Sequence, residues 1–281
     1  MALPEHMPMP EAVTLADPAK YFEMLDRASL THWWGRSIEY VERRWLQHAL
    51  RKRARRFPYT WLDVGCGTGT RLRLWADWGC WGERVGVEPE IDAVEAAAAD
   101  PGISVRIGRL PDLPYESERF DLITAFDVLQ HVSAERRRDS IWSIAERLRP
   151  DGILLMRTNA PGLFRKGVDD PTIVDSARLN RWLTEAGMRV ARSSRFNACG
   201  GLAEDVTRAI RRKKGAGSVP GPFKSGLPQT WTRRPAGHVL ASWCGFVESR
   251  ICGTGLVNFP IGHSYLVMAI KDGNHDRTSV G

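Results

Sequence analysis

The sequence predicts an α/β fold, a doubly wound and mostly parallel sheet of seven strands with helices on both faces. Two observations support this prediction. Short apolar runs of strand length alternate with amphipathic or alanine-rich runs of helix length along most of the 281 residues. A glycine-rich turn joins the first strand to the next helix. No stretch approaches the roughly 18 consecutive apolar residues of a membrane-spanning helix, and no internal repeat is visible.

The first structured element is a helix expected over residues 21–57, after a loose arm over residues 1–20 that is rich in proline and methionine. The apolar side chains expected on one face of this helix are Ile38, Val41, Trp45, Leu46 and Leu50. The helix would end in the basic run Arg51 to Arg56. We favour a solvated helix end for this run, because cations suit the negative end of a helix dipole. A binding patch is the alternative.

The remaining elements follow from changes of hydrophobic period and from glycine and proline punctuation. The expected strands are 59–64, 84–88, 103–107, 120–126, 153–156, 189–196 and 264–270. The expected helices are 90–99, 133–148, 175–186, 203–212 and 236–251. We divide the chain into an N-terminal arm with helices that cover the site (1–57), a sheet domain (58–198 and 236–272) and a basic, lid-like insert (199–235).

Composition narrows the function classes without selecting one. The chain is 43% hydrophobic and 26% charged, as is typical of a soluble globular protein. Its five cysteines show no CxxC and no zinc spacing, which favours reduced thiols, a cytoplasmic location and no metal site. The N-terminus has no basic region before an apolar run, so we expect no secretory signal. A net charge of +7 suggests an anionic partner.

The glycine-rich turn carries most of the chemistry. Gly65, Gly67 and Gly69 follow the first strand, where backbone N–H groups at a helix start can approach a ligand. Thr70 stands where a nicotinamide-type fingerprint requires glycine or alanine, so a hydride-transfer enzyme is disfavoured. Glu88 ends the second strand, where an acid can accept hydrogen bonds from ribose hydroxyls. The pattern therefore predicts a nucleoside-containing ligand.

Five motifs occur in order: LDVGCGTG (62–69), VGVEP (85–89), GRLPDLPY (108–115), FDLITAFDVLQHV (120–132) and LRPDGILLMR (148–157). Together they resemble the motifs of class I S-adenosylmethionine-dependent methyltransferases, with their Rossmann-like fold and antiparallel seventh strand. HWWGR (32–36) and FPIGHS (259–264) resemble segments of the bacterial small-molecule branch of that family. DDPTIV (169–174) departs from the His-x-Arg-x-Tyr-like stretch of many of these relatives.

The resemblance implies a binding site for S-adenosylmethionine, with S-adenosylhomocysteine as the product. The residues implied around the methionine moiety and the sulfonium are Arg36 for the carboxylate, Asp63 to order the loop, Gly65, Cys66 through its backbone, Gly67, Gly69, Phe126, Asp127 and Val128. The residues implied around the adenosine are Glu88 and Pro89 at the ribose, Arg109 and Leu110 beside the adenine, and Asp112 as an alternative contact to its N6.

Because the sulfonium methyl is already activated, such an enzyme mainly aligns acceptor, methyl and sulfur for an in-line SN2 transfer. An oxygen or nitrogen acceptor also needs a base, for which His131 and His32 are the candidates, each with a structural role as the alternative. His263 is interpreted as a turn residue. Trp33 and Trp34 would either line the acceptor site or pack the N-terminal helix.

The leading functional hypothesis is methyl transfer to a small-molecule acceptor: a natural product, a saccharide or a lipid-linked metabolite. One alternative is a nucleic-acid methyltransferase, suggested by the basic runs 51–56 and 208–214 and disfavoured because no RNA module or base-flipping motif is visible. The other alternative is a non-catalytic S-adenosylmethionine-binding protein. The insert 199–235 would cover the acceptor or contact an anionic group or a membrane surface.

Overall fold

The computed structural model describes residues 31–53, 58–161, 171–198 and 235–273. The predicted arm over residues 1–20, the helix expected at 203–212 and almost all of the insert 199–235 lie outside these residues. Among the helices that are described, none combines the length and the apolar character needed to cross a membrane.

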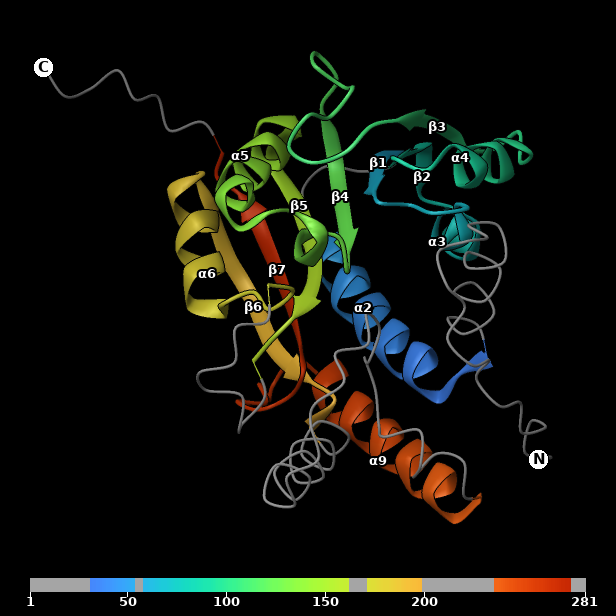
Figure 1. Ribbon diagram of the computed structural model, residues 1–281, viewed down its shortest axis with the longest axis vertical. Coiled ribbons are helices and arrows are strands. Elements are labelled where there is room, and N and C mark those ends of the chain that lie inside the picture. Colours follow the sequence, from blue (N-terminus) through green and yellow to red (C-terminus); the bar gives the residue numbers. More distant parts are fainter. Residues whose placement is uncertain (1–30, 54–57, 162–170, 199–234, 274–281) are drawn as a thin grey trace, which may run out of the picture.

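One seven-stranded sheet forms the centre of the molecule, with the strand order β3-β2-β1-β4-β5-β7-β6 (Figure 1). Its strands are β1 Tyr59–Val64, β2 Trp81–Glu88, β3 Ser104–Ile107, β4 Phe120–Phe126, β5 Leu148–Asn159, β6 Met188–Phe196 and β7 Ser264–Lys271. The first five are parallel, whereas β7 pairs antiparallel with both β5 and β6. The predicted fold class and its antiparallel last strand are therefore confirmed.

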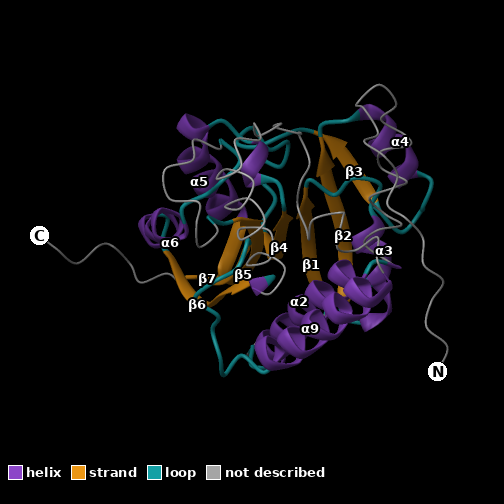
Figure 2. Ribbon diagram, turned by 60° about the horizontal axis from the view of Figure 1, so that its bottom comes forward, coloured by secondary structure: helices purple, strands orange, loops and turns teal. Residues whose placement is uncertain are grey.

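Helices cover both faces of the sheet (Figure 2). The described α-helices are α2 Trp33–Arg51, α3 Thr70–Leu74, α4 Ile91–Ala98, α5 Arg137–Arg147, α6 Ser176–Glu185 and α9 Pro235–Gly253. The short 3-10 helices are η1 Ala76–Trp78, η2 Leu129–His131 and η3 Ala134–Arg136. Side chains of α5 and α6 pack into one core, and those of α2, α3 and α9 pack into the other.

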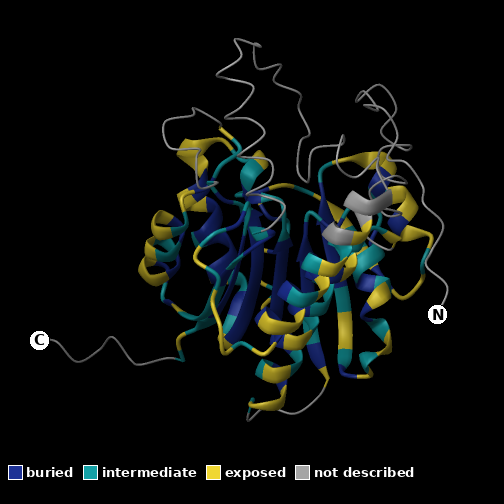
Figure 3. Ribbon diagram, turned by 90° about the horizontal axis from the view of Figure 1, so that it is seen from below, coloured by how far each residue is buried: buried dark blue, intermediate teal, exposed yellow. Residues whose placement is uncertain are grey.

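The two cores share the central strands, which are buried on both faces as expected for parallel strands between helical layers (Figure 3). On β4, Leu122 belongs to the α2 side and its neighbour Ile123 to the α5 side, following the two-residue period of a strand. Residues Ile38, Val41, Trp45, Leu46 and Leu50 are all buried on α2. The predicted apolar face of this helix is therefore confirmed.

Several predicted boundaries were wrong. The first helix does not extend to residue 57: α2 ends at Arg51, where the N–H of Lys52 donates to the carbonyl of Ala49 and the N–H of Arg53 to that of Leu50. Strand β2 begins at Trp81, three residues earlier than predicted, because Trp81 pairs with Tyr59. Strand β5 begins at Leu148 and includes the predicted turn 150–152, with a register shift opposite β4 and Asp151 at a φ of 61°.

Candidate active site

The glycine loop closes β1 against β2. The backbone N–H groups of Gly65 and Cys66 both donate to the carbonyl of Val87, at 2.7 and 3.1 Å. Gly65 has a φ of 71°, and a Cβ on it would lie 2.4 Å from Cγ2 of Val128. The left-handed backbone and the missing side chain therefore bring the loop directly against Val128, the second residue after β4. Gly65 and Val128, both predicted site residues, are brought together.

Glu88, the last residue of β2, is bound into the same loop. Its carboxylate accepts a hydrogen bond from the N–H of Gly67 at 2.9 Å and another from the N–H of Glu90 at 3.3 Å. Burial raises the pKa of Glu88, and these two hydrogen bonds oppose the rise. Each carboxylate oxygen has two lone pairs, so each can accept a further donor such as a ribose hydroxyl. The arrangement fits the predicted nucleoside.

The side chain of Asp63 is hydrogen-bonded to strand β4 rather than to the glycine loop. Its carboxylate accepts from the hydroxyl of Thr124 on β4 at 2.5 Å, and that hydroxyl accepts from the indole N–H of Trp61 at 2.8 Å. Burial raises the pKa of Asp63 to about 6, opposed by the Thr124 hydrogen bond. The side chain links β1 to β4 beneath the loop, and its expected role in ordering the loop stays a prediction.

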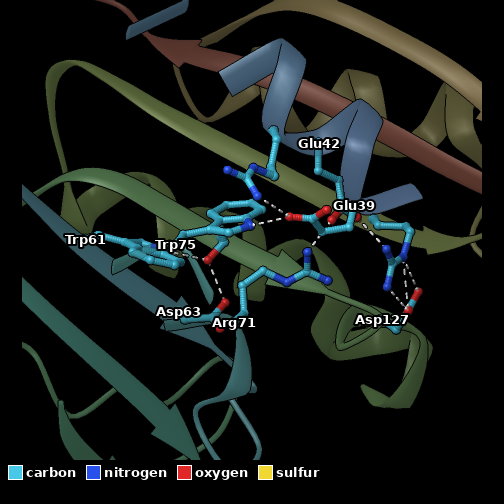
Figure 4. Close-up of polar contacts among 10 residues, drawn as sticks. Glu39, Glu42, Trp61, Asp63, Arg71, Trp75 and Asp127 are labelled. Atoms are coloured by element: carbon cyan, nitrogen blue, oxygen red, sulfur yellow. Dashed lines mark hydrogen bonds and ion pairs between the residues drawn. The ribbon is translucent and has the colours of Figure 1, made fainter. Parts of the chain in front are cut away.

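A network of buried ion pairs lies at the ends of β4 and β5 (Figure 4). Glu42 of α2 is fully buried and pairs with Arg71 of α3 at 2.5 Å and with Arg157 of β5. The Arg157 guanidinium also holds Asp127 through Nη2 at 2.6 Å and Nε at 3.0 Å, a two-point contact that fixes orientation. Burial raises the pKa of Glu42, and its two arginine partners oppose the rise.

The network also positions aromatic side chains. The Arg71 guanidinium lies over the ring of Phe126 at 4.4 Å and over the ring of Trp75 at 5.1 Å. The Trp75 indole donates to Glu39 of α2 at 3.0 Å. Phe126 and Asp127 at the end of β4 are thus held by residues of α2, α3 and β5. Asp127 has a φ of 59°, a strained backbone conformation that its contacts with Arg157 support.

Other predicted residues of the loop fit a role that uses the backbone. The Cys66 thiol is buried against Gly86, where an added Cβ would come within 2.4 Å of its sulfur, and burial raises its pKa. Gly69 has a φ of 80° and forms the N-cap of α3. Pro89 follows Glu88 at the end of β2 and is partly buried. Because the Cys66 side chain is buried and Gly69 has none, both residues are available to a ligand through the backbone.

The residues predicted around the adenine separate into different surroundings. The Leu110 side chain is buried in the core under α5, and its expected place beside the base stays a prediction. Arg109 is exposed. Asp112 forms an exposed ion pair with Arg136 at 2.8 Å, so the alternative contact to N6 competes with this partner.

The predicted residues at the start of α2 have contacts of their own. His32 is the N-cap residue, and its Nδ1 accepts from the N–H of Trp34 at 3.3 Å. The Trp34 ring lies 5.1 Å from that of Phe196, and Trp33 lies so close to Gly245 of α9 that an added Cβ would come within 2.6 Å of its ring. Packing therefore accounts for both tryptophans. Arg36 is exposed, and its expected contact with a carboxylate stays a prediction.

Sequence reasoning missed Glu42, Arg71, Thr124 and Arg157. One signal was available for Glu42, an acid between apolar positions on the buried face of a helix, where a charge needs a partner. A similar signal marked Arg157, a cation at the end of the apolar run ILLM. Neither signal identifies the partner. In the part of the chain that the structure describes, no three histidine, cysteine or acidic side chains cluster as a metal would require.

Comparison with known proteins agrees with this geometry. A family model described as "Methyltransferase domain" matches residues 62–156, the span from the glycine loop to β5. The chain carries a class I S-adenosylmethionine-dependent methyltransferase domain. Its cofactor is S-adenosylmethionine, and the Glu88 carboxylate at the glycine loop fits that group.

Two curated relatives resemble part of this methyltransferase domain. Both are named "Ubiquinone biosynthesis O-methyltransferase, mitochondrial". The protein from Candida albicans is 36% identical over 86 residues, which cover 28% of this chain and 26% of that protein. The protein from Schizosaccharomyces pombe is 31% identical over 102 residues, 34% of this chain and 36% of that protein. The chain thus spans between a quarter and somewhat more than a third of these relatives.

Among solved structures, the methyltransferase domain resembles the plantazolicin methyltransferase BpumL, whose structure holds a triazolic desmethylPZN analog and SAH. The TM-score is 0.55 at 10% sequence identity, and 90% of each chain is covered. A likeness at this identity shows the shared fold.

Proposed function

We propose that the protein is an enzyme that transfers the methyl group of S-adenosylmethionine to a small-molecule acceptor, in the range of natural products, saccharides and lipid-linked metabolites. The observation that carries this proposal is the buried Glu88 carboxylate, held by the Gly67 N–H at the end of β2. The two curated relatives support an acceptor of small-molecule type, since both are named for ubiquinone biosynthesis.

When bound, the cofactor supplies a methyl group that is already activated on sulfur. The protein then has to bind and orient. Glu88 would accept hydrogen bonds from the ribose hydroxyls, and Gly65 with Val128 would form the wall beside the sulfonium. The Arg157 contact fixes Asp127 at the end of β4, so that this edge of the site does not have to reorganise during the reaction.

An acceptor hydroxyl would lose a proton during transfer, and His131 is the better candidate for taking it. His131 is exposed on η2, three residues after Val128. His32, by contrast, uses Nδ1 as the acceptor that caps α2. Replacement of a general base lowers turnover by roughly 100- to 10,000-fold, whereas replacement of a structural histidine at this exposed position would change turnover little.

The binding half of the proposal is tested by titrating S-adenosylhomocysteine into Glu88→Ala by calorimetry. Loss of a hydrogen-bonded charge costs about 1–3 kcal/mol, which predicts roughly 5- to 150-fold weaker binding. The matched control is Glu95→Ala, an exposed acid of α4, which should bind as the wild type does. Equal affinities for the wild type and Glu88→Ala would contradict the site.

The catalytic half is tested by a mass-spectrometric search for products that gain CH₂ from a labelled methyl donor. A small-molecule product supports the proposal. Cofactor binding without turnover on any acceptor favours a non-catalytic binding protein. Transfer to nucleic acid has less support, since Arg53 of the basic run lies over the ring of Tyr59 at 5.4 Å and donates to the backbone of Asp121 at 2.9 Å.

A further inference from the structure

A second cluster of cations lies on the outer side of α2, away from the buried network. Arg44, His48 and Arg51 project from successive turns of α2, and Arg192 reaches them from β6. With Gly253 and Thr254 at the end of α9 they line a cavity of about 50 Å³. A cavity of this volume suits a small group and is far too small for a nucleoside cofactor.

The backbone of β6 and of the turn after α9 places Arg192 in this cluster. The pairing of β6 with β7 shifts register between Val190 and Arg192, so the consecutive residues Ala191 and Arg192 both serve the α2 side. The guanidinium then lies against Gly255, where an added Cβ would come within 1.9 Å of Nη1. Gly255 has a φ of 69°, so two backbone irregularities accommodate this one side chain.

The charges of the cluster are not balanced within the described ranges. The contacts of the structure give Arg44, Arg51 and Arg192 no carboxylate partner there, whereas Arg43 of α2 pairs with Glu39 and Arg71 of α3 pairs with Glu42. Desolvation lowers the pKa of His48, and the charges of Arg192, Lys52, Arg51 and Arg44 lower it further. The four charges that act most strongly on this imidazole are all positive. Such a site gains free energy when an anion binds.

We propose that Arg44, His48, Arg51 and Arg192 form a binding site for a phosphate group. Planar guanidinium groups bind phosphate oxygens through paired N–H donors, and three of them converge here from two elements. The phosphate belongs either to an anionic lipid headgroup or to a soluble phosphate ester.

The surroundings of the site suit a headgroup. Leu256 and Val257, two and three residues after the lining residue Thr254, are 88% and 44% exposed. Apolar side chains beside a basic cluster are typical of proteins that bind at the surface of an anionic membrane.

The test compares two double variants of equal net charge in the full chain. Arg44→Gln with Arg192→Gln removes two cations of the cluster. Arg178→Gln with Arg181→Gln removes two exposed cations of α6, on the other face of the sheet. Binding is measured by co-sedimentation with vesicles of phosphatidylcholine, with and without phosphatidylglycerol. In a second arm, inorganic phosphate is titrated while the His48 imidazole resonances are followed by NMR.

A lipid site predicts that the cluster variant binds phosphatidylglycerol vesicles roughly 30-fold more weakly, from about 1 kcal/mol for each cation near the surface. The α6 variant should change little, because charges are screened over about 8 Å. A soluble ligand predicts that phosphate shifts the His48 resonances in the wild type and not in the cluster variant, without vesicle binding. Equal losses in both variants, or no response to either probe, would overturn the proposal.

Discussion

The β2 side and the β5 side of the active site are built in different ways. On the β2 side, Glu88 and Gly67 lie 21 residues apart, within two motifs joined by α3, η1 and the start of β2. On the β5 side, Arg157 binds Glu42, 115 residues away on a helix that precedes the sheet. The first arrangement is a local consequence of a strand–loop–strand unit. The second arises only when the whole chain has folded, so the two sides should respond differently to substitution.

The largest effect is expected on the β5 side. Arg157→Met leaves the buried Glu42 with only Arg71 as a partner. It also removes the two guanidinium donors, Nε and Nη2, that hold Asp127. Breaking a buried ion pair in this way costs about 3–5 kcal/mol of unfolding free energy, measured by urea denaturation. The control is Arg136→Met, whose exposed pair with Asp112 contributes at most about 1 kcal/mol. Similar losses of unfolding free energy in both variants would show that the buried network contributes no more to stability than an exposed ion pair does.

The next effect concerns pH and the strand pair that supports the loop. Because the folded pKa of Asp63 is about 6, above the ordinary value of about 4, the folded protein holds this proton more tightly than the unfolded chain. The contribution of the protonated Asp63 to the free energy of unfolding is therefore complete below about pH 4 and is lost as the pH rises through 6. Asp63→Asn does not titrate and keeps an oxygen for Thr124.

Denaturant unfolding of the wild type and Asp63→Asn across this range checks the expectation. The variant should be more stable by up to about 3 kcal/mol above pH 7, with a difference that shrinks toward pH 4. A difference that is constant with pH would show that Asp63 does not titrate in this window.

A smaller effect is expected at the loop on the β2 side. Gly65→Ala strains a left-handed backbone and meets Val128, at a cost of about 1–3 kcal/mol, with weaker binding of S-adenosylhomocysteine. Gly79→Ala is the matched control, because its φ of 65° is similar and nothing lies within 4 Å of an added Cβ. Adding Val128→Ala to Gly65→Ala should restore part of the loss. No restoration would mean that the contact is unimportant.

The contrast between local contacts and contacts over a long sequence separation also explains which parts of the fold could be predicted from the sequence. Strands β1 and β4 were predicted to the residue, because each is an apolar run bounded by turn residues. The start of β2 was not, since Trp81, Gly82 and Glu83 form no apolar run and join the sheet through the pairing of Trp81 and Glu83 with β1. The predicted helix end at 57 failed because basic residues continue past the last helical turn without a breaker before Pro58.

For the site, the residues predicted correctly to lie together belong to contiguous motifs, as Gly65, Gly67, Glu88 and Val128 do. The residues missed have partners that are distant in sequence. Nothing local to Glu42 specifies Arg157, and nothing local to Thr124 specifies Asp63 on the neighbouring strand.

The aromatic side chains next to the glycine loop have a practical consequence. The indoles of Trp61, Trp75, Trp78 and Trp81 follow one another with ring centroids 4.9 to 5.7 Å apart. Chromophores at this separation couple electronically, so the protein should show an exciton couplet in its circular dichroism and share one excited state among several rings. Arg71, one residue into the helix that follows the loop, lies over Trp75. Ligand arrival at the loop would therefore be visible optically, without any label.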